Sequence, residues 1–368
     1  MLKKNLVKIG IIGTGVGIRT HLKGFRGIEG CEVTAIVGSR KERSIEFANK
    51  YNISNACADY RELCDRDDID LVCVCSPNKY HYEAVKYALS KGKNIICEKP
   101  VSYISEEVNR LALIPQRPDT FMYVDHQLRF NPYMRKIREI IHENLLGHIY
   151  LVRINQVGLG FSDSNLPWSW SFDGNEGGGV RLAMASHFND LIQFWFDSRK
   201  VLAVSGNLNP IFKERCIDGQ KKLVTGSTLC NAQIQLENEL SIMYSINAGG
   251  FSSFKFEIDM AGDKGELHFD LVNKLIVYTE DRKGEPQKVN VSGVFEDERE
   301  NKASLFSGSF RYFAPLVIRK LQGEIVPELC DAATIEQAKY NCKLLDAIKK
   351  SANTGIPVVY SCEENSYV

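Results

Sequence analysis

The sequence lacks a net charge and any long apolar run. Lysine plus arginine and aspartate plus glutamate each total 46 in 368 residues. Without an excess of positive charge, no field concentrates a polyanion, so we expect no nucleic-acid partner. The longest apolar runs, such as Leu71–Cys75 and Leu191–Phe196, are far shorter than the ~20 residues that a membrane helix needs. We therefore expect no membrane partner.

Cysteine pairing motifs are also missing. The chain has 11 cysteines, an odd number, and no Cys-x-x-Cys pair or Cys/His metal spacing. Cys73 and Cys75 alternate with valines in an apparent strand, where a buried thiol behaves as a small hydrophobe. We predict reduced, mostly structural cysteines and no metal site. Because residues 1–5 show no signal-peptide pattern, we expect a cytoplasmic protein.

The length of the chain and a change in its hydrophobic pattern predict two domains. Up to about residue 120, short apolar runs, glycine or proline turns and amphipathic segments repeat in the order typical of βαβ units. After residue 124, longer alternating segments are typical of antiparallel strands with one solvated face. We predict an α/β Rossmann domain with a parallel sheet over residues 1–124. We predict an α+β domain over residues 125–368, with a large, mostly antiparallel open sheet.

Individual elements follow from the same patterns. The strands expected in the first domain are Val7–Ile12, Glu32–Val37, Leu71–Cys75, Asn94–Cys97 and Thr120–Val124. The strands expected in the second domain are Tyr150–Asn155, Ala232–Leu236, Leu240–Ile246, Phe254–Met260, Gly265–Phe269 and Lys274–Tyr278. The helices expected are Ser44–Tyr51, Tyr82–Ser90, Asn131–Asn144, Val180–Phe196 and Ala332–Ser351.

A glycine turn after the first strand indicates a dinucleotide site. The turn reads Gly13-Thr14-Gly15-Val16-Gly17-Ile18, and a helix is expected from about Val16. Glycines there let the backbone approach a pyrophosphate, whose charge is met by amides at the helix start. The third glycine falls at Gly17 rather than at the position of Ile18, so helix packing on the strand is expected to differ slightly. The alternative is an ordinary tight turn.

The end of the second strand bears on which dinucleotide binds. A carboxylate there normally accepts hydrogen bonds from the adenosine ribose, but this chain has Ser39 and Arg40 after Gly38. Both side chains can bind a 2′-phosphate, Arg40 by a charge-assisted contact. We therefore predict NADP as the preferred cofactor, with NAD possible. In the alternative, these charges simply coat the start of a helix.

Several motifs together resemble the glucose-fructose oxidoreductase / inositol dehydrogenase / MocA family. The motifs are Ser76-Pro77-Asn78 with His81, Glu98-Lys99-Pro100, Gln127-Leu128-Arg129-Phe130, Gly177-Gly178-Gly179 and the segment bearing His187 and Asp190. The resemblance covers essentially the whole chain. It implies that the second domain binds the substrate, a sugar, cyclitol or related compound, and that the open sheet of this domain forms the interface of a homodimer or homotetramer.

The resemblance also implies site residues. Lys99 is the first catalytic candidate, because an ammonium at the end of a strand can stabilise alkoxide charge on the reacting oxygen. The second is His187, which can take up the hydroxyl proton. We assign to the cofactor site the glycine turn, Ser39, Arg40 and, from the motifs, Ser76, Pro77, Asn78, His81, Glu98, Lys99, Gln127 and Arg129. The structural alternatives are a surface lysine, a core histidine and, at position 129, a buried structural cation.

The chain departs from the usual dehydrogenase pattern beside His187. Ala183 stands where an aspartate is common, four residues earlier, so either Asp190 takes over as partner of the imidazole or His187 acts alone. Asp190 is also a weaker candidate for binding the substrate. Trp168 and Trp170 are weaker candidates for stacking on a sugar ring, because such residues more often anchor a loop. We predict a hydride-transferring NAD(P)-dependent dehydrogenase or reductase. The alternative is a catalytically weak or inactive dinucleotide-binding regulatory protein of the same fold.

Overall fold

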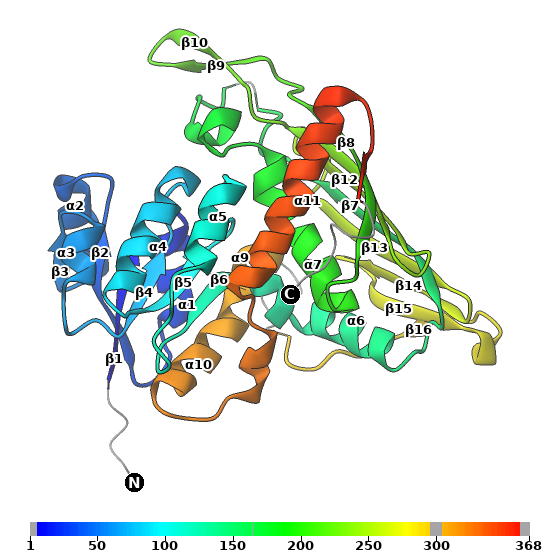
Figure 1. The fold of residues 1–368 in the computed structure, drawn as a ribbon, viewed down its shortest axis with the longest axis horizontal. Coiled ribbons are helices and arrows are strands. Elements are labelled where there is room, and N and C mark those ends of the chain that lie inside the picture. The colour runs from blue at the N-terminus through cyan, green and yellow to red at the C-terminus, as the bar shows by residue number, and fades with distance from the viewer. Residues whose placement is uncertain (1–5, 164, 295–303, 361–368) are drawn as a thin grey trace. The chain divides into compact units, whose positions relative to one another are not determined.

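The computed structural model describes residues 6–163, 165–294 and 304–360 (Figure 1). The chain forms two compact units, the first made of Met1–Asn131 and Ser304–Lys339, the second of Pro132–Ala303 and Tyr340–Val368. The boundaries of these units differ from those of the predicted domains. The prediction places one boundary at residue 124, whereas the first compact unit combines two separate stretches of sequence.

The first unit contains a parallel sheet of six strands in the order β3-β2-β1-β4-β5-β6. The strands are β1 (Val7–Ile12), β2 (Cys31–Val37), β3 (Asn55–Cys57), β4 (Leu71–Val74), β5 (Asn94–Glu98) and β6 (Met122–Asp125). All residues of β4 are buried, which explains why its sequence is a continuous apolar run. The strand order reverses between β1 and β4, where ligands bind in sheets of this kind.

The first unit also contains helices and helical turns, which precede, separate or follow these strands along the chain. They are η1 (Gly17–Leu22), α1 (Lys23–Phe25), α2 (Lys41–Tyr51), α3 (Tyr60–Cys64), η2 (Asn78–Tyr80), α4 (His81–Ser90), α5 (Ser105–Ala112), η3 (Gln127–Phe130), α9 (Ser304–Gly308), α10 (Phe310–Leu321) and η8 (Pro327–Asp331). The last helix, α11 (Ile335–Thr354), begins in the first unit and ends in the second.

Helix α10 completes the core of the first unit. Phe310 is fully buried and its ring centroid lies 4.2 Å from that of His21 and 5.3 Å from that of Phe25. A side chain at Gly24 would overlap the Phe310 ring, so glycine is needed for this close approach. Sequence patterns did not predict α10, although it lies in the same apolar cluster as Ile9 and Ile11 of β1.

The second unit contains a sheet of nine strands in the order β16-β15-β14-β13-β7-β12-β11-β8-β17. Its strands are β7 (Ile149–Val157), β8 (Val201–Asn209), β11 (Leu229–Leu236), β12 (Ser241–Asn247), β13 (Lys255–Gly262), β14 (Gly265–Asp270), β15 (Lys274–Thr279), β16 (Gln287–Lys288) and β17 (Val358–Val359). Only β7 and β12 pair in parallel. The expected hairpin of β11 and β12 is confirmed.

The remaining elements of the second unit are α6 (Pro132–His142), η4 (Trp170–Phe172), η5 (Gly174–Glu176), η6 (Arg181–Ala185), α7 (Ser186–Phe196), η7 (Glu280–Arg282) and the separate hairpin of β9 (Glu214–Ile217) with β10 (Gln220–Leu223). Figure 1 shows α6 and α7 beside the large sheet. The predicted fold class, a Rossmann domain followed by a domain with a mostly antiparallel sheet, is confirmed.

The two faces of the large sheet differ in burial. On one face, Tyr244 of β12 packs on Phe188 of α7, and its hydroxyl donates a hydrogen bond to Asn189 Oδ1 at 3.0 Å. On the other face, Met243 of β12 is 42% exposed, and residues of β7, β8, β11, β12 and β13 line a hollow of about 650 Å³. This second face is the open one that the alternating sequence pattern predicts.

The described part of the chain contains no helix that is both long and apolar enough to cross a membrane. Its ten cysteines are free thiols, as predicted. The eleventh, Cys362, lies outside the described residues.

Substituting Phe310→Ala should lower the free energy of unfolding by about 3–5 kcal/mol, because the cavity left beside His21 and Phe25 cannot close completely. Urea unfolding followed by fluorescence measures this change. Phe251→Ala is the matched control: this ring is 83% exposed, so its loss should cost less than about 0.5 kcal/mol. Equal losses for both variants would contradict the assignment of Phe310 to the core.

Candidate active site

The glycine turn joins β1 to η1 through two tightly packed residues. Gly13 has a φ of 115°, and a Cβ added there would overlap the carbonyl oxygen of Cys75. Its amide donates to the Val37 carbonyl at 2.8 Å. A Cβ at Gly17 would lie 2.6 Å from Ile11 Cγ2. Both positions therefore need glycine, and Gly17 provides the close contact between helix and strand that is usual one residue later.

Gly15, between them, faces open space. No heavy atom lies within 4 Å of a Cβ added there. The helix that follows starts as a π-helix, and no side chain caps its start at Val16. The first amides of η1 are therefore available to an anion. An open glycine beside an uncapped helix start fits the pyrophosphate of a dinucleotide. Thr14 and Val16 are half-buried and Ile18 is buried, so Ile18 offers the cofactor only its backbone.

Ser39 and Arg40 are exposed just beyond the end of β2. The turn before them is fixed by the Gly38 amide, which donates to Ser44 Oγ at 2.8 Å. Arg40 Nε lies 3.7 Å from Glu42 Oε2, and both side chains are largely exposed. Such a pair contributes little free energy, so Arg40 can leave it for a stronger phosphate contact.

His81 holds together the loops that follow β4 and β5. The ring is buried, with Nδ1 2.8 Å from the Pro100 carbonyl and Nε2 2.6 Å from the Ser76 carbonyl. Burial lowers the pKa of His81, and the two carbonyls oppose this shift. Because its ring nitrogens contact backbone, His81 fixes the positions of Ser76 and Pro100 in the predicted cofactor region. Pro77 and Asn78 lie in the same loop, where Asn78 is buried at the start of η2.

Lys99 lies directly after β5 and before Pro100, to which it is joined by a cis peptide bond. Its side chain is half-buried. Burial lowers the pKa of Lys99, while the carboxylates of Glu98 and Asp125 act in the opposite direction. The result is a lowered pKa for an amine at the carboxyl end of the sheet, an environment that suits a catalytic lysine.

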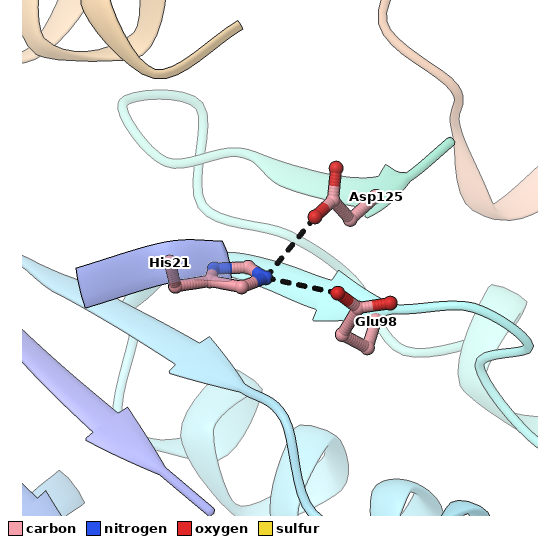
Figure 2. A group of neighbouring side chains, drawn as sticks. All are labelled: His21, Glu98 and Asp125. Atoms are coloured by element: carbon pink, nitrogen blue, oxygen red, sulfur yellow. Dashed lines mark hydrogen bonds and ion pairs between the residues drawn. The ribbon is translucent and has the colours of Figure 1, made fainter. Parts of the chain in front are cut away.

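Beside Lys99, three buried side chains meet (Figure 2). His21 Nε2 lies 3.1 Å from Glu98 Oε1 and 3.0 Å from Asp125 Oδ2. Burial would lower the pKa of His21, but contacts with Cys75 and the Asp125 carboxylate outweigh it and hold that pKa well above its ordinary value. Burial raises the pKa of Asp125 to about 6. For Glu98, burial raises the pKa, but the hydrogen bond and charge of His21 together with the charges of Lys99 and His81 outweigh burial and lower it.

The sequence analysis did not identify His21 and Asp125. Asp125 is the last residue of β6 and is paired in register with Glu98 at the end of β5. The signal that could have identified Asp125 is its position at the carboxyl end of the last parallel strand. These three side chains offer one nitrogen and two oxygens within 4.8 Å of one another, a spacing that a metal ion could use. The absence of a metal site stays a prediction.

Gln127 and Arg129 lie in η3, and both are buried. Arg129 Nη1 donates to the Asp331 carbonyl at 3.1 Å and to Gln337 Oε1 at 3.0 Å. Arg129 thus binds the returning segment of the first unit, which favours the structural alternative for this cation. Gln127 Oε1 is buried without a hydrogen-bond partner among the described residues, so Gln127 has a vacant acceptor for a ligand.

His187 and Asp190 belong to the second unit, on the buried helix α7. A π-helical turn, η6, precedes this helix and contains Ala183. The start of α7 is fixed by Ser186, whose hydroxyl donates to the Leu182 carbonyl at 2.7 Å and whose own carbonyl accepts from Asn341 at 2.7 Å. The site roles predicted for His187 and Asp190 stay predictions.

Trp168 contacts the exposed hairpin of β9 and β10. Its indole N–H donates to the Leu223 carbonyl at 3.1 Å, and Lys222 Nζ lies 3.2 Å from the ring centroid. Its backbone amide donates to the Cys216 carbonyl. These contacts favour the loop-anchor alternative for Trp168. Trp170 is half-buried in η4, and sugar stacking by either ring stays a prediction.

Comparisons with known proteins agree with this geometry. A family model described as an oxidoreductase family with an NAD-binding Rossmann fold matches residues 7–126. A second, described as the C-terminal α/β domain of an oxidoreductase family, matches residues 138–359.

Individual relatives have low sequence identity to this chain, but the matches cover most of it. The chain is 25% identical over 270 residues to the uncharacterized oxidoreductase sll0816 of Synechocystis sp., covering 73% of this chain and 72% of that protein. It is 24% identical over 365 residues to glucose-fructose oxidoreductase domain-containing protein 2 of Xenopus tropicalis, covering 96% and 93%. A solved structure of levoglucosan dehydrogenase with NADH and L-sorbose superposes with a TM-score of 0.84 at 19% identity, covering 96% and 99%.

Gly15→Ala should leave the fold intact, because space for the methyl group exists. It should weaken nicotinamide dinucleotide binding by about tenfold or more, since the methyl group would occupy the approach of the pyrophosphate. Fluorescence titration with the reduced cofactor measures the change. Gly160→Ala, also in open space without a positive φ, is the control and should bind normally. Unchanged affinity in Gly15→Ala would place the cofactor elsewhere.

Proposed function

Because the chain belongs to the glucose-fructose oxidoreductase / inositol dehydrogenase / MocA family of oxidoreductases, we propose that it transfers hydride between NADP and a hydroxyl or ketone of a sugar, cyclitol or sugar derivative. The observation that carries this proposal is the turn after β1. Gly13 and Gly17 are packed too tightly for any side chain, while Gly15 faces open space beside an uncapped helix start. A pyrophosphate explains this combination better than an ordinary tight turn does.

Lys99 polarises the reacting oxygen in this proposal. Its ammonium donates a hydrogen bond to the substrate hydroxyl or carbonyl and stabilises the alkoxide charge that develops during transfer. The bound nicotinamide supplies or accepts the hydride. On the family resemblance, His187 takes the hydroxyl proton in oxidation and returns it in reduction.

The preference for NADP rests on Ser39 and Arg40. No acidic residue lies between the end of β2 and Arg40 to repel a 2′-phosphate. Arg40 is 75% exposed and held only by a weak pair with Glu42, so it can turn toward that phosphate at little cost. The substrate class rests on the family and on levoglucosan dehydrogenase, whose solved complex contains NADH and L-sorbose.

We propose that a second copy of the chain covers the open face of the large sheet, giving a homodimer or homotetramer. The family resemblance supports this interface, and the hollow beside Arg153 and Met243 supplies a partly apolar surface for it. Met243, which lines this hollow, is 42% exposed, and a partner would bury it favourably.

A regulatory protein that binds NADP without turnover is the second candidate. Ala183 supports it, because the chain has no carboxylate four residues before His187 to orient the imidazole. Lys99 and the glycine turn support the enzyme.

Turnover should appear when NADP is incubated with a panel of sugars, inositols and nucleotide sugars, and nicotinamide absorbance measures it. Lys99→Met should lower kcat by about 10²–10³-fold, the usual cost of losing a donor to developing negative charge. Lys91→Met, a surface lysine paired with Asp65, is the control and should retain activity. Cofactor binding without turnover on the whole panel, in both oxidation and reduction, would favour the regulatory candidate.

Arg40→Ala should weaken NADPH binding by about tenfold or more, because a charge-assisted hydrogen bond to the 2′-phosphate is lost. NADH binding should change little. The control is Arg43→Ala, which removes a cation that pairs with Glu46 and stacks on Phe47 in the same helix. Wild-type protein that binds NADH more tightly than NADPH would refute the proposed preference.

A further inference from the structure

Glu98 and Asp125 are an unfavourable pair unless a cation joins them. They are register partners at the ends of the neighbouring strands β5 and β6, and both are buried. Like charges opposite one another destabilise a sheet, and in a buried site only one of two such carboxylates ionises readily. Strand pairing places these two carboxylates side by side regardless of their charge. A third, positively charged group is therefore needed to compensate their negative charge.

His21 supplies that cation. Its Nε2 is hydrogen-bonded to Glu98 Oε1 at 3.1 Å and makes an ion-pair contact with Asp125 Oδ2 at 3.0 Å, so one ring nitrogen faces both carboxylates (Figure 2). The ring is fully buried and packs on Phe310, with centroids 4.2 Å apart. A protonated His21 with two ionised carboxylates carries a net charge of −1. One ammonium neutralises that charge.

Lys99 is that ammonium. It directly follows Glu98 at the carboxyl end of β5, where Glu98 is the register partner of Asp125 at the end of β6. The other titratable groups that face these four residues are His81, Cys73, Cys75 and Cys97. Burial raises the pKa of Cys75 to about 12 and also raises those of Cys73 and Cys97.

We propose that His21 and Asp125 are positioning residues for Lys99, and that with Glu98 they form a neutral buried quartet that keeps Lys99 protonated. Neither residue needs to touch substrate or cofactor. The positive charge of His21 lies between the two carboxylates, and their remaining negative charge stabilises the ammonium that polarises the reacting oxygen. The quartet deepens the proposed function, because the role of Lys99 as a donor rests on it.

A metal ion is the rival occupant of the same three side chains. Bound at His21 Nε2, a divalent ion would displace the proton on that nitrogen. Two negative charges, a divalent ion and Lys99 would then leave a net charge of +1 in a buried site, which is costly. The charge balance therefore favours the proton.

Histidine and lysine resonances of the intact protein test the proposal. In protein labelled with ¹⁵N-histidine, the His21 signal is assigned by its loss in His21→Gln. His21 should remain doubly protonated at pH values above 6.5, where an ordinary histidine has lost one ring proton. With ¹³Cε-labelled lysine, assigned through Lys99→Met, Asp125→Asn should lower the pKa of Lys99 by about one unit or more, because a facing negative charge is removed.

Asp259→Asn is the matched control. Asp259 and Asp270 flank His268 at 2.7 Å and 3.1 Å, so this surface histidine also lies between two carboxylates. The variant should shift His268 and leave Lys99 unchanged. A neutral His21 at pH 7, an unchanged pKa of Lys99 in Asp125→Asn, or a stoichiometric metal in the purified protein would each overturn the proposal. The third outcome needs only wild-type protein, so a variant that fails to fold does not decide the test.

Kinetics add a second measurement if the protein turns over. The loss of kcat/KM at high pH should move to lower pH in Asp125→Asn by the same amount as the pKa of Lys99. A uniform loss of kcat/KM at every pH would assign Asp125 a merely structural role. If no substrate is found but the resonances behave as expected, the proposed enzyme function fails while the quartet stands.

Discussion

The close approach of backbones at the carboxyl ends of β1 and β4 is the constraint on which the candidate site depends. Gly13 lies against the Cys75 carbonyl in a conformation closed to other residues, and its amide binds the end of β2 at Val37. Three strand ends are thus fixed by one residue without a side chain. The turn needs no further support, so Gly15 and the first amides of η1 can face a ligand. His81 fixes the next two loops in a comparable way.

The same edge of the sheet concentrates charge. Parallel strands end side by side, so the terminal residues of β5 and β6 bring two carboxylates into register. Burial makes such a pair unfavourable unless a cation is placed with equal accuracy. His21 is carried to that point by the π-helical turn after the glycines. The π-helix η1 therefore connects the glycine turn to the cluster of His21, Glu98 and Asp125, and the two form one local structure.

Much of this arrangement could be predicted from the sequence. The strand Val7–Ile12 matches β1 residue for residue, because a buried parallel strand is a continuous apolar run between turn residues. His21 and Asp125 could not be found in this way, since a lone histidine on a helix and an acid after a strand have no periodicity. Helix α10 was missed because its place in the core depends on contacts with residues almost the whole chain away. The π-helical turns also depend on packing that sequence patterns do not encode.

The discontinuous first unit has a consequence for how the protein is made. A ribosome synthesises the glycine turn and all six parallel strands early, yet Phe310, which packs on His21, emerges only after every strand of the second sheet except β17. Until then the apolar surface beside η1 and α1 is uncovered on the nascent chain, a condition that invites association with chaperones. The dinucleotide fold of this protein is therefore among the first parts translated and among the last to be completed.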